Sequence, residues 1–249
     1  MISANSSIHD DIKRSLRFVV TGFGPFGGVP ENPTTVLANG IVDYLNQHGM
    51  NDLALITSTF VLETSAEAAR AAIDKFWEDE QANEYSEQTT TILLHLGVNY
   101  KGEKFHLESC AYNEATFRIP DERGYQPNKE SILGEDISVG RALETLLDVN
   151  SLVEQLNYTI EKHESESMSV CRKNSILSND PGRFVCNYIY CYSLDKFKSH
   201  KLQIVSNDPR GGTRCLFLHV PPVDVVPQDQ QFWFVARLME MLYEDQLKS

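Results

Sequence analysis

Two hydrophobic patterns alternate along this chain and predict its architecture. The first consists of short runs of consecutive apolar or β-branched residues, bounded by glycine or proline, which are typical of strands in a buried parallel sheet. The clearest run is Thr-Ile-Leu-Leu-His-Leu-Gly at 91–97. On this pattern we predict strands at 16–21, 53–61, 91–97, 173–177 and 215–220, with shorter ones at 105–107 and 115–119.

The second pattern is a recurrence of apolar residues every three or four positions, the spacing of a helix with one buried face. Asn-Pro-Thr-Thr at 32–35 supplies the capping residues that begin such a helix. Polar residues at 81–90 and 163–172 break the pattern and indicate a surface loop and an insertion. We predict helices at 32–46, 65–80, 143–156, 184–194 and 228–244.

Strands that alternate with helices favour an α/β sandwich with a mostly parallel sheet. No repeat or linker is found, so we predict one catalytic α/β domain at 16–249 after a loose leader at 1–15. In such sheets, chemistry gathers at the carboxyl ends of the strands. The glycine-rich loop at 22–28, Gly97 and His219 all follow or end strands, so we expect them to share a cleft.

Charge and cysteine usage narrow the classes of function. The net charge of −13 and the lack of a Lys/Arg run argue against nucleic acid or an anionic membrane as partner. Five cysteines without a CxxC pair suggest neither a disulfide scaffold nor a zinc site, which fits a reducing compartment. No apolar run could span a bilayer or form a signal peptide. We therefore expect a cytoplasmic protein without metal or cofactor.

The turn formers at 178–182 precede a predicted helix whose first turn contains Cys186. Unpaired backbone N–H groups and the positive end of the helix dipole favour an anion there, and hence the reactive thiolate. Intracellular cysteines are more often small buried hydrophobic residues. Spacing alone favours that second interpretation, so a nucleophilic role for Cys186 needs support from other residues.

A cysteine nucleophile needs a base, and the base needs a group that orients it. His219 ends a buried strand, from which its ring can reach over the sheet edge, whereas His95 lies in mid-strand. Glu108 follows the loop after Gly97 and can orient an imidazole or remain a solvated carboxylate.

Arg118 stands beside an apolar residue, close to a proline. Its guanidinium can donate to a developing oxyanion or to a substrate carbonyl. The alternative is an ion pair with Asp121 or Glu122.

The loop Gly-Phe-Gly-Pro-Phe-Gly-Gly at 22–28 is not a phosphate-binding loop. No Lys-Ser/Thr follows it, and Pro25 and Phe26 interrupt the GxGxxG spacing. Two aromatic residues held by glycines suit the flat face of a small ring better than a pyrophosphate.

Four sequence blocks together resemble pyroglutamyl peptidase type I, a family of cysteine peptidases also called pyrrolidone-carboxylate peptidases. The blocks occur in the family's order and cover about 16–244. The resemblance implies a cytosolic, metal-independent enzyme with a three-layer α/β/α fold that removes N-terminal pyroglutamate from peptides through a thioester. The blocks are Thr-Gly-Phe-Gly-Pro-Phe-Gly-Gly at 21–28 with Asn-Pro at 32–33, Arg-Ile-Pro-Asp to Gly-Tyr-Gln-Pro at 118–127, Gly-Arg-Phe-Val-Cys-Asn at 182–187, and Phe-Leu-His-Val-Pro at 217–221.

The resemblance also implies roles for individual residues. Cys186 matches the nucleophile, His219 the general base, Glu108 the third member and Arg118 an arginine at the oxyanion site. A flat, neutral lactam suits an aromatic pocket because stacking and amide hydrogen bonds recognise it without a charge. In the pocket, Phe23 and Phe26 match the aromatic residues that sandwich the ring, and Asn32 matches a residue that supports the first loop. Phe184 and Val185 match residues that line the pocket. Val98 stands where bacterial members often have a substrate-contacting glutamine.

The chain departs from the family pattern around Glu108, which is flanked by His106 and Ser109, so Glu114 remains the alternative orienting acid. A homo-oligomer is left open as well as a monomer. A non-catalytic lactam binder is a second hypothesis, and faster alkylation of Cys186 than of the other thiols would argue against it. A nucleoside phosphorylase-like enzyme is a third, which rests on fold analogy alone and would need a phosphate site.

Overall fold

The structure, a computed structural model, describes residues 15–27, 31–82, 89–163, 174–201 and 212–248. Most of the leader predicted at 1–15 and of the insertion predicted at 163–172 lies outside these ranges. Ser15 begins the first strand, and His163 ends a helix. No helix in the described ranges is long and apolar enough to cross a membrane.

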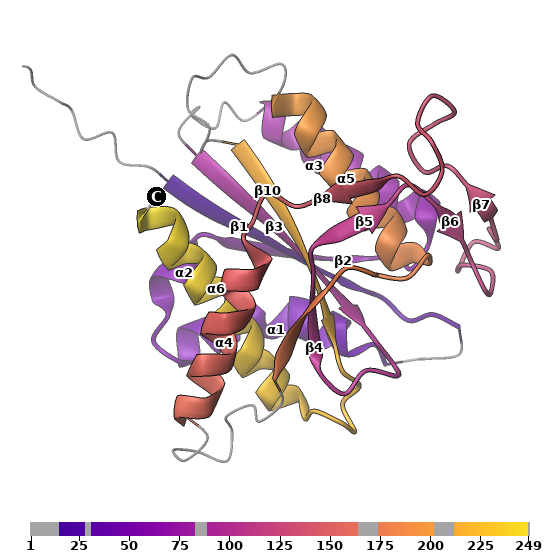
Figure 1. Cartoon of the computed structure of the whole chain (residues 1–249). Helices are drawn as coiled ribbons and strands as arrows, with labels where there is room; N and C mark the ends of the chain where they lie inside the picture. Colours follow the sequence, from indigo (N-terminus) through magenta and orange to yellow (C-terminus); the bar gives the residue numbers. More distant parts are fainter. Residues whose placement is uncertain (1–14, 28–30, 83–88, 164–173, 202–211, 249) are drawn as a thin grey trace, which may run out of the picture.

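A six-stranded mixed sheet forms the centre of the molecule, with the strand order β2-β1-β3-β10-β4-β9 (Figure 1). The first four strands in this order are parallel, β4 runs antiparallel to β10, and β9 is parallel to β4. The prediction of a mostly parallel sheet is therefore confirmed. The strands are β1 Ser15–Phe23, β2 Thr57–Leu62, β3 Thr89–Val98, β4 Phe105–Glu108, β9 Ser175–Ser178 and β10 Gly212–Val220.

Helices cover both faces of this sheet, which gives the three-layer α/β/α sandwich that the resemblance implies (Figure 1). Successive side chains of a strand point to opposite faces, so each strand contributes to two hydrophobic clusters. The helices of the first face are α1 Pro33–Gln47, α2 Asn51–Leu55, α4 Val149–His163 and α6 Gln228–Lys248, and those of the second are α3 Ala66–Ala82 and α5 Val185–Lys201.

The chain between β4 and α4 forms an extension that packs on the α5 side of the sheet (Figure 1). Its two small antiparallel pairs are β5 Cys110–Tyr112 with β8 Ala142–Glu144 and β6 Ala115–Thr116 with β7 Asn128–Glu130. The fully buried Asn113 fixes the extension, because its Oδ1 accepts from the amides of Ile132 and Leu133 and its Nδ2 donates to the carbonyls of Ile137 and Ser138.

The strand predicted at 53–61 is wrong in its first half. Residues 51–55 form α2, and only Thr57–Leu62 forms β2. Leu53 and Ala54 are buried in the cluster that also contains α1 and α6, while the Thr57 hydroxyl donates to the Leu53 carbonyl at 2.5 Å and closes the helical turn. A short apolar run gave no periodicity by which to separate the two states.

The helix predicted at 143–156 is also wrong in its first part, since residues 142–144 form β8 and α4 begins at Val149. Leu143 packs into the cluster on the α5 side, whereas Leu152 packs into the cluster on the α6 side. The chain therefore passes from one face to the other before α4, where the Asp148 carboxylate accepts from the Ser151 amide at 3.0 Å and caps the helix.

Candidate active site

Cys186 lies in the first turn of α5, as the sequence predicts. The chain turns into this helix through Gly182, whose φ of +78° is disfavoured for other residues. The first backbone bond of the helix joins the Tyr188 amide to the Phe184 carbonyl at 3.0 Å. The amides at 185–187 precede this bond and have no partner within the helix, so they are donors for a negative charge near the thiol.

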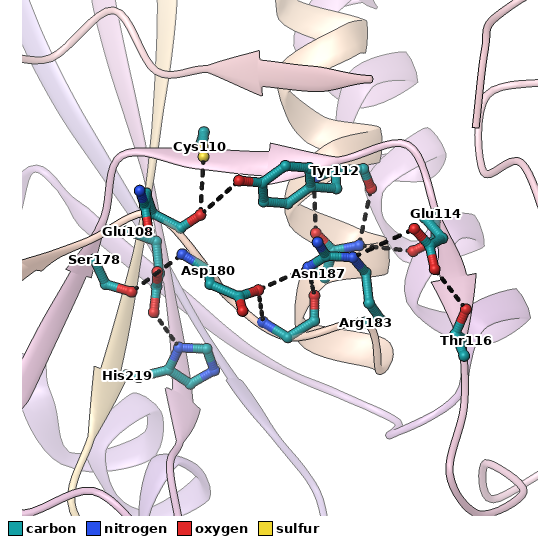
Figure 2. Close-up of polar contacts among 12 residues, drawn as sticks. Glu108, Cys110, Tyr112, Glu114, Thr116, Ser178, Asp180, Arg183, Asn187 and His219 are labelled. Atoms are coloured by element: carbon teal, nitrogen blue, oxygen red, sulfur yellow. Dashed lines mark hydrogen bonds and ion pairs between the residues drawn. The ribbon is translucent and has the colours of Figure 1, made fainter. Parts of the chain in front are cut away.

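Asn187 holds the start of α5 against the extension. Its Oδ1 accepts from the Tyr112 amide at 2.8 Å, and its Nδ2 donates to the carbonyls of Tyr112 and Glu114, both at 2.9 Å (Figure 2). The Asn187 side chain is fully buried. The residue directly after the thiol is therefore fixed by three hydrogen bonds to β5 and the residues that follow it.

The carboxyl end of the central sheet supplies the surface that the thiol approaches. Gly97 of β3 is in register with His219 of β10, which is in register with His106 of β4. A β-carbon at Gly97 would lie 3.1 Å from the Sγ of Cys186 and 2.7 Å from the ring of Phe217. Glycine at this position thus leaves the space that the sulfur occupies beside the strand.

His219 and Glu108 form a buried pair: the Nδ1 of His219 and the Oε1 of Glu108 are 2.7 Å apart (Figure 2). The two residues are only 7% and 1% exposed. Burial disfavours the charged imidazole, but hydrogen bonding and charge interaction with Cys186 and Glu108 outweigh it and raise the pKa of His219 to about 10. The geometry therefore favours an imidazolium at His219.

The alternative acid, Glu114, has other partners. Its Oε1 accepts from the Thr116 hydroxyl at 2.8 Å, and its Oε2 lies 3.7 Å from the Nε of Arg183. Figure 2 shows this cluster at the opposite end of the view from His219. Of the two acids considered from the sequence, the structure brings Glu108 to the imidazole.

His95 is buried below this surface, two residues before Gly97 on β3. Its Nδ1 is 2.6 Å from the Thr21 hydroxyl of β1, and its Nε2 is 3.0 Å from the Ser193 hydroxyl of α5. Burial lowers the pKa of His95 to about 3, so the ring is neutral at ordinary pH. His95 thus links α5, the helix that carries Cys186, to the sheet from within the core.

The aromatic residues predicted for the ring pocket occupy different depths. Phe26 is partly buried, with its ring centroid 6.2 Å from that of Phe184. Phe23 is 2% exposed and lies beneath, 6.4 Å from Phe217. Tyr100, which the sequence analysis did not single out, also contacts Phe26, with 5.9 Å between the ring centroids. Its position in a polar turn, Asn-Tyr-Lys-Gly, carries no pattern that would have identified it.

The remaining pocket positions are placed as follows. Asn32 caps α1 by accepting from the Thr34 amide and donates to the Gly24 carbonyl, both at 3.1 Å, so it supports the first loop. Val185 is fully buried in the α5-side cluster. Val98 packs against the cluster on the other face of the sheet, so its side chain is not brought together with Cys186.

Arg118 is exposed on the extension, between β6 and the turn at 121–125. The Asp121 carboxylate accepts from the amides of Ala66, Arg123 and Tyr125, and Glu122 accepts from the Gly27 amide. The two acids that could have neutralised Arg118 are thus engaged by backbone amides. Within the described part of the chain, no cluster of three or more His, Cys, Asp or Glu side chains could hold a metal ion.

Comparison of the sequence with known proteins shows which family the chain resembles. The family profile described as pyroglutamyl peptidase matches residues 16–231. The pyrrolidone-carboxylate peptidase of Bacillus cytotoxicus is 28% identical over 205 residues, covering 82% of this chain and 77% of that protein. The human pyroglutamyl-peptidase 1 is 23% identical over 205 residues, covering 82% and 78%.

Solved structures share the fold. The pyrrolidone carboxyl peptidase of Thermococcus litoralis superposes with a TM-score of 0.67 at 22% identity, covering 93% of this chain and 94% of that one. The pyroglutamyl peptidase I of Bacillus amyloliquefaciens gives a TM-score of 0.63 at 21% identity, covering 91% and 96%. The chain belongs to the pyroglutamyl peptidase family.

Proposed function

We propose that this protein is a cysteine exopeptidase that hydrolyses the N-terminal pyroglutamyl residue of peptides through a thioester intermediate. The observation that carries the proposal is the buried contact of 2.7 Å between the side chains of His219 and Glu108. Cys186 lies close enough to the same imidazole to help raise the pKa of His219. A thiol, an imidazole and a carboxylate from α5, β10 and β4 then act as nucleophile, acid–base and orienting group.

In the first half of the reaction, the sulfur of Cys186 attacks the carbonyl carbon that joins pyroglutamate to the next residue. A C–S bond forms, and the carbonyl electron pair moves onto oxygen. When the tetrahedral intermediate collapses, the C–N bond breaks and the imidazolium of His219 gives its proton to the departing amine. The products of this half are the shortened peptide and a thioester on Cys186.

In the second half, water hydrolyses the thioester. Neutral His219 takes a proton from the water while the water oxygen attacks the thioester carbonyl. The C–S bond then breaks, and the sulfur leaves as a thiolate. Pyroglutamate is released, and the proton on His219 restores the starting imidazolium. Glu108 accepts a hydrogen bond from Nδ1 throughout, so that Nε2 faces the reaction and the charged ring is stabilised.

The negative charge on the tetrahedral oxygen requires donors aimed at it. The amides at 185–187, which have no partner within α5, supply them next to the sulfur. We assign Arg118 to the same task or to the substrate carbonyl, because its neighbouring acids are engaged with backbone amides.

The lactam ring is recognised by an aromatic pocket in this proposal. Phe26 and Phe184 offer ring surface at the site, and the Asn32 amide keeps the loop that carries Phe26 in place. A neutral ring with a donor and an acceptor suits such a pocket. The proposed pocket comprises Phe23, Phe26, Asn32, Phe184 and Val185, whereas the side chain of Val98 faces the other side of the sheet.

We further propose that residues 16–249 act as one catalytic domain in the cytoplasm. The four described cysteines, Cys110, Cys186, Cys191 and Cys215, are free thiols, which suits a reducing compartment. Its partners are small peptides that begin with pyroglutamate, and a net charge of −13 disfavours nucleic acid.

The test is release of a fluorescent amine from a pyroglutamyl conjugate, measured beside a prolyl conjugate that lacks only the ring carbonyl. We expect efficient cleavage of the first and none of the second. Equal cleavage of both would disprove specificity for the lactam, and cleavage of neither would disprove the peptidase activity.

A further inference from the structure

Tyr100 lies in a hydrogen-bonded turn at the carboxyl end of β3. The Gly102 amide donates to the Asn99 carbonyl at 2.9 Å, and the Lys101 amide donates to the Asn99 side chain at 3.2 Å. The Asn99 amide in turn donates to the carbonyl of Val220, the residue after His219. The turn that carries Tyr100 is therefore tied to the same strand end that positions His219.

The ring of Tyr100 extends from this turn to the first loop. Its centroid is 5.9 Å from that of Phe26, at an angle of 59° between the ring planes. Phe26 also contacts Phe184, at 6.2 Å and 43°, and Phe184 lies two residues before Cys186. Three segments that are distant in the sequence thus bring aromatic rings together next to the nucleophile.

The surroundings of Tyr100 suit a residue that binds a ligand at the surface rather than a residue of the hydrophobic core. Its side chain is 43% exposed although it packs on an aromatic neighbour. Burial of the remainder raises the pKa of its phenol, which is neutral at ordinary pH in any case. An uncharged, half-exposed ring beside Phe26 extends the apolar surface that a flat lactam can cover.

We propose that Tyr100 is a substrate-binding residue whose ring packs against the pyroglutamyl ring and forms, with Phe26 and Phe184, an aromatic wall of the site. This inference rests on the proposed function, because it names a further contact for the same substrate. An aromatic contact of this kind adds binding that is present in the ground state and is kept in the transition state. It therefore acts on KM and leaves kcat unchanged.

The experiment compares the full chain with Tyr100→Ala, which removes the ring, and Tyr100→Phe, which keeps it. KM and kcat are measured with a pyroglutamyl fluorescent amide, and the affinity for 2-pyrrolidone is measured by calorimetry, which needs no turnover. For Tyr100→Ala we expect KM and the Kd of 2-pyrrolidone to rise together by roughly 3- to 10-fold, the range that an aromatic contact supplies, with kcat within about twofold of wild type. Tyr100→Phe should match wild type.

Tyr158→Ala is the matched control, because Tyr158 is a 68% exposed tyrosine on α4, and it should leave every parameter unchanged. Tyr100→Leu keeps an apolar cover over Phe26 and serves if Tyr100→Ala fails to fold, with the same weakening expected. Unchanged 2-pyrrolidone affinity in a folded Tyr100→Ala or Tyr100→Leu protein would overturn the inference, as would a fall in kcat at constant KM. If the wild-type protein binds 2-pyrrolidone but does not cleave the amide, the proposed function is overturned. The role of Tyr100 is then decided by the effect of its substitution on the Kd of 2-pyrrolidone.

Discussion

The charge on His219 depends on two neighbours that come from different parts of the chain. Glu108 reaches it from the antiparallel neighbour strand, and Cys186 reaches it from the first turn of α5. Burial alone would keep this imidazole neutral, so the imidazolium exists because both partners outweigh the loss of solvation. The charged form of His219 therefore depends on the positions of both Glu108 and Cys186.

The contact with His219 predicts how fast Cys186 reacts with an electrophile relative to the other described cysteines. Burial raises the pKa of Cys191 to about 12 and that of Cys215 well above its ordinary value, and it also raises that of Cys110. We expect iodoacetamide at neutral pH to alkylate Cys186 at least tenfold faster than these three thiols, as followed by peptide mass spectrometry. Alkylation at equal rates would argue against a nucleophilic Cys186 and for a non-catalytic lactam binder. Cys186→Ala should lower turnover by thousands-fold or more.

Replacing Glu108 by glutamine tests the orienting role. Glu108→Gln keeps the size of the side chain but removes the negative charge, which lowers the pKa of His219 because one of the two groups that raise it is lost. Since the imidazolium is the form present below that pKa, the alkaline limb of kcat/KM should move to lower pH. The loss at neutral pH should be smaller than for Cys186→Ala. An unchanged pH profile would assign the orienting role to another acid.

At the scale of helices and strands, the extension between β4 and α4 holds the helix that carries Cys186. Asn187 joins the start of α5 to β5, and Tyr190 of the same helix donates from its hydroxyl to the Glu108 carbonyl at 2.9 Å. The helix that carries the thiol therefore also fixes the backbone of the proposed orienting acid. Movement of α5 would change the position of both groups together.

Asn187→Ala should show this coupling. It leaves the Tyr112 amide and the carbonyls of Tyr112 and Glu114 without their partner, which costs about 2–4 kcal/mol of unfolding free energy. We also expect kcat to fall at least tenfold in the protein that remains folded, because the Cys186 turn is no longer held. Urea denaturation and active-site titration separate the two effects.

Asn157→Ala is the matched control for that prediction. Asn157 of α4 likewise bonds a backbone segment, accepting from the Ser175 amide at 2.8 Å and donating to the Ser175 carbonyl at 3.0 Å, but it does so at the sheet edge. It should lose stability with kcat unchanged. Equal kcat values for the two variants would contradict a positioning role for Asn187.

The sequence predicted elements where one hydrophobic face persists for several turns or residues. The helices α1, α3, α5 and α6 and the strands β3 and β10 belong to this class. β7 could not be predicted because all three of its residues, 128–130, are exposed, so backbone pairing alone defines it. The break before α4 could not be predicted because Leu143 and Leu147 are four positions apart, as on one face of a helix, but pack on different sides of the sheet.

For the site, the resemblance of sequence blocks supplies the candidate residues, and the structure adds how they meet. The contact between Glu108 and His219 depends on the register of β4 against β10, which no local pattern specifies. The resemblance predicts a pocket role for Val98, yet strand alternation turns its side chain to the other face of the sheet. Tyr100 could not be predicted from the sequence because its contact with Phe26 joins two segments that are distant along the chain.

At the scale of the whole molecule, two buried histidines link stability to pH in opposite directions. The pKa of His95 is lowered to about 3 and that of His219 is raised to about 10, from an unfolded value near 6.5. Above pH 6.5, His95 is neutral in both states and contributes no pH dependence. His219 gives stability that is fully present below pH 6.5 and is lost as pH rises toward 10.

Acidification should therefore destabilise the fold through His95. Below pH 6.5 His95 is protonated in the unfolded chain but stays neutral in the folded protein. His95 therefore lowers the free energy of unfolding by about 1.4 kcal/mol per pH unit between pH 6.5 and 3. His95→Gln keeps polar atoms between Thr21 and Ser193 but cannot titrate. We expect it to be less stable than wild type at pH 7, with a difference that shrinks by about 2 kcal/mol at pH 5 in urea denaturation. A constant difference across this range would mean that His95 is protonated in the folded protein, and that the hydroxyls of Thr21 and Ser193 accept from a charged ring.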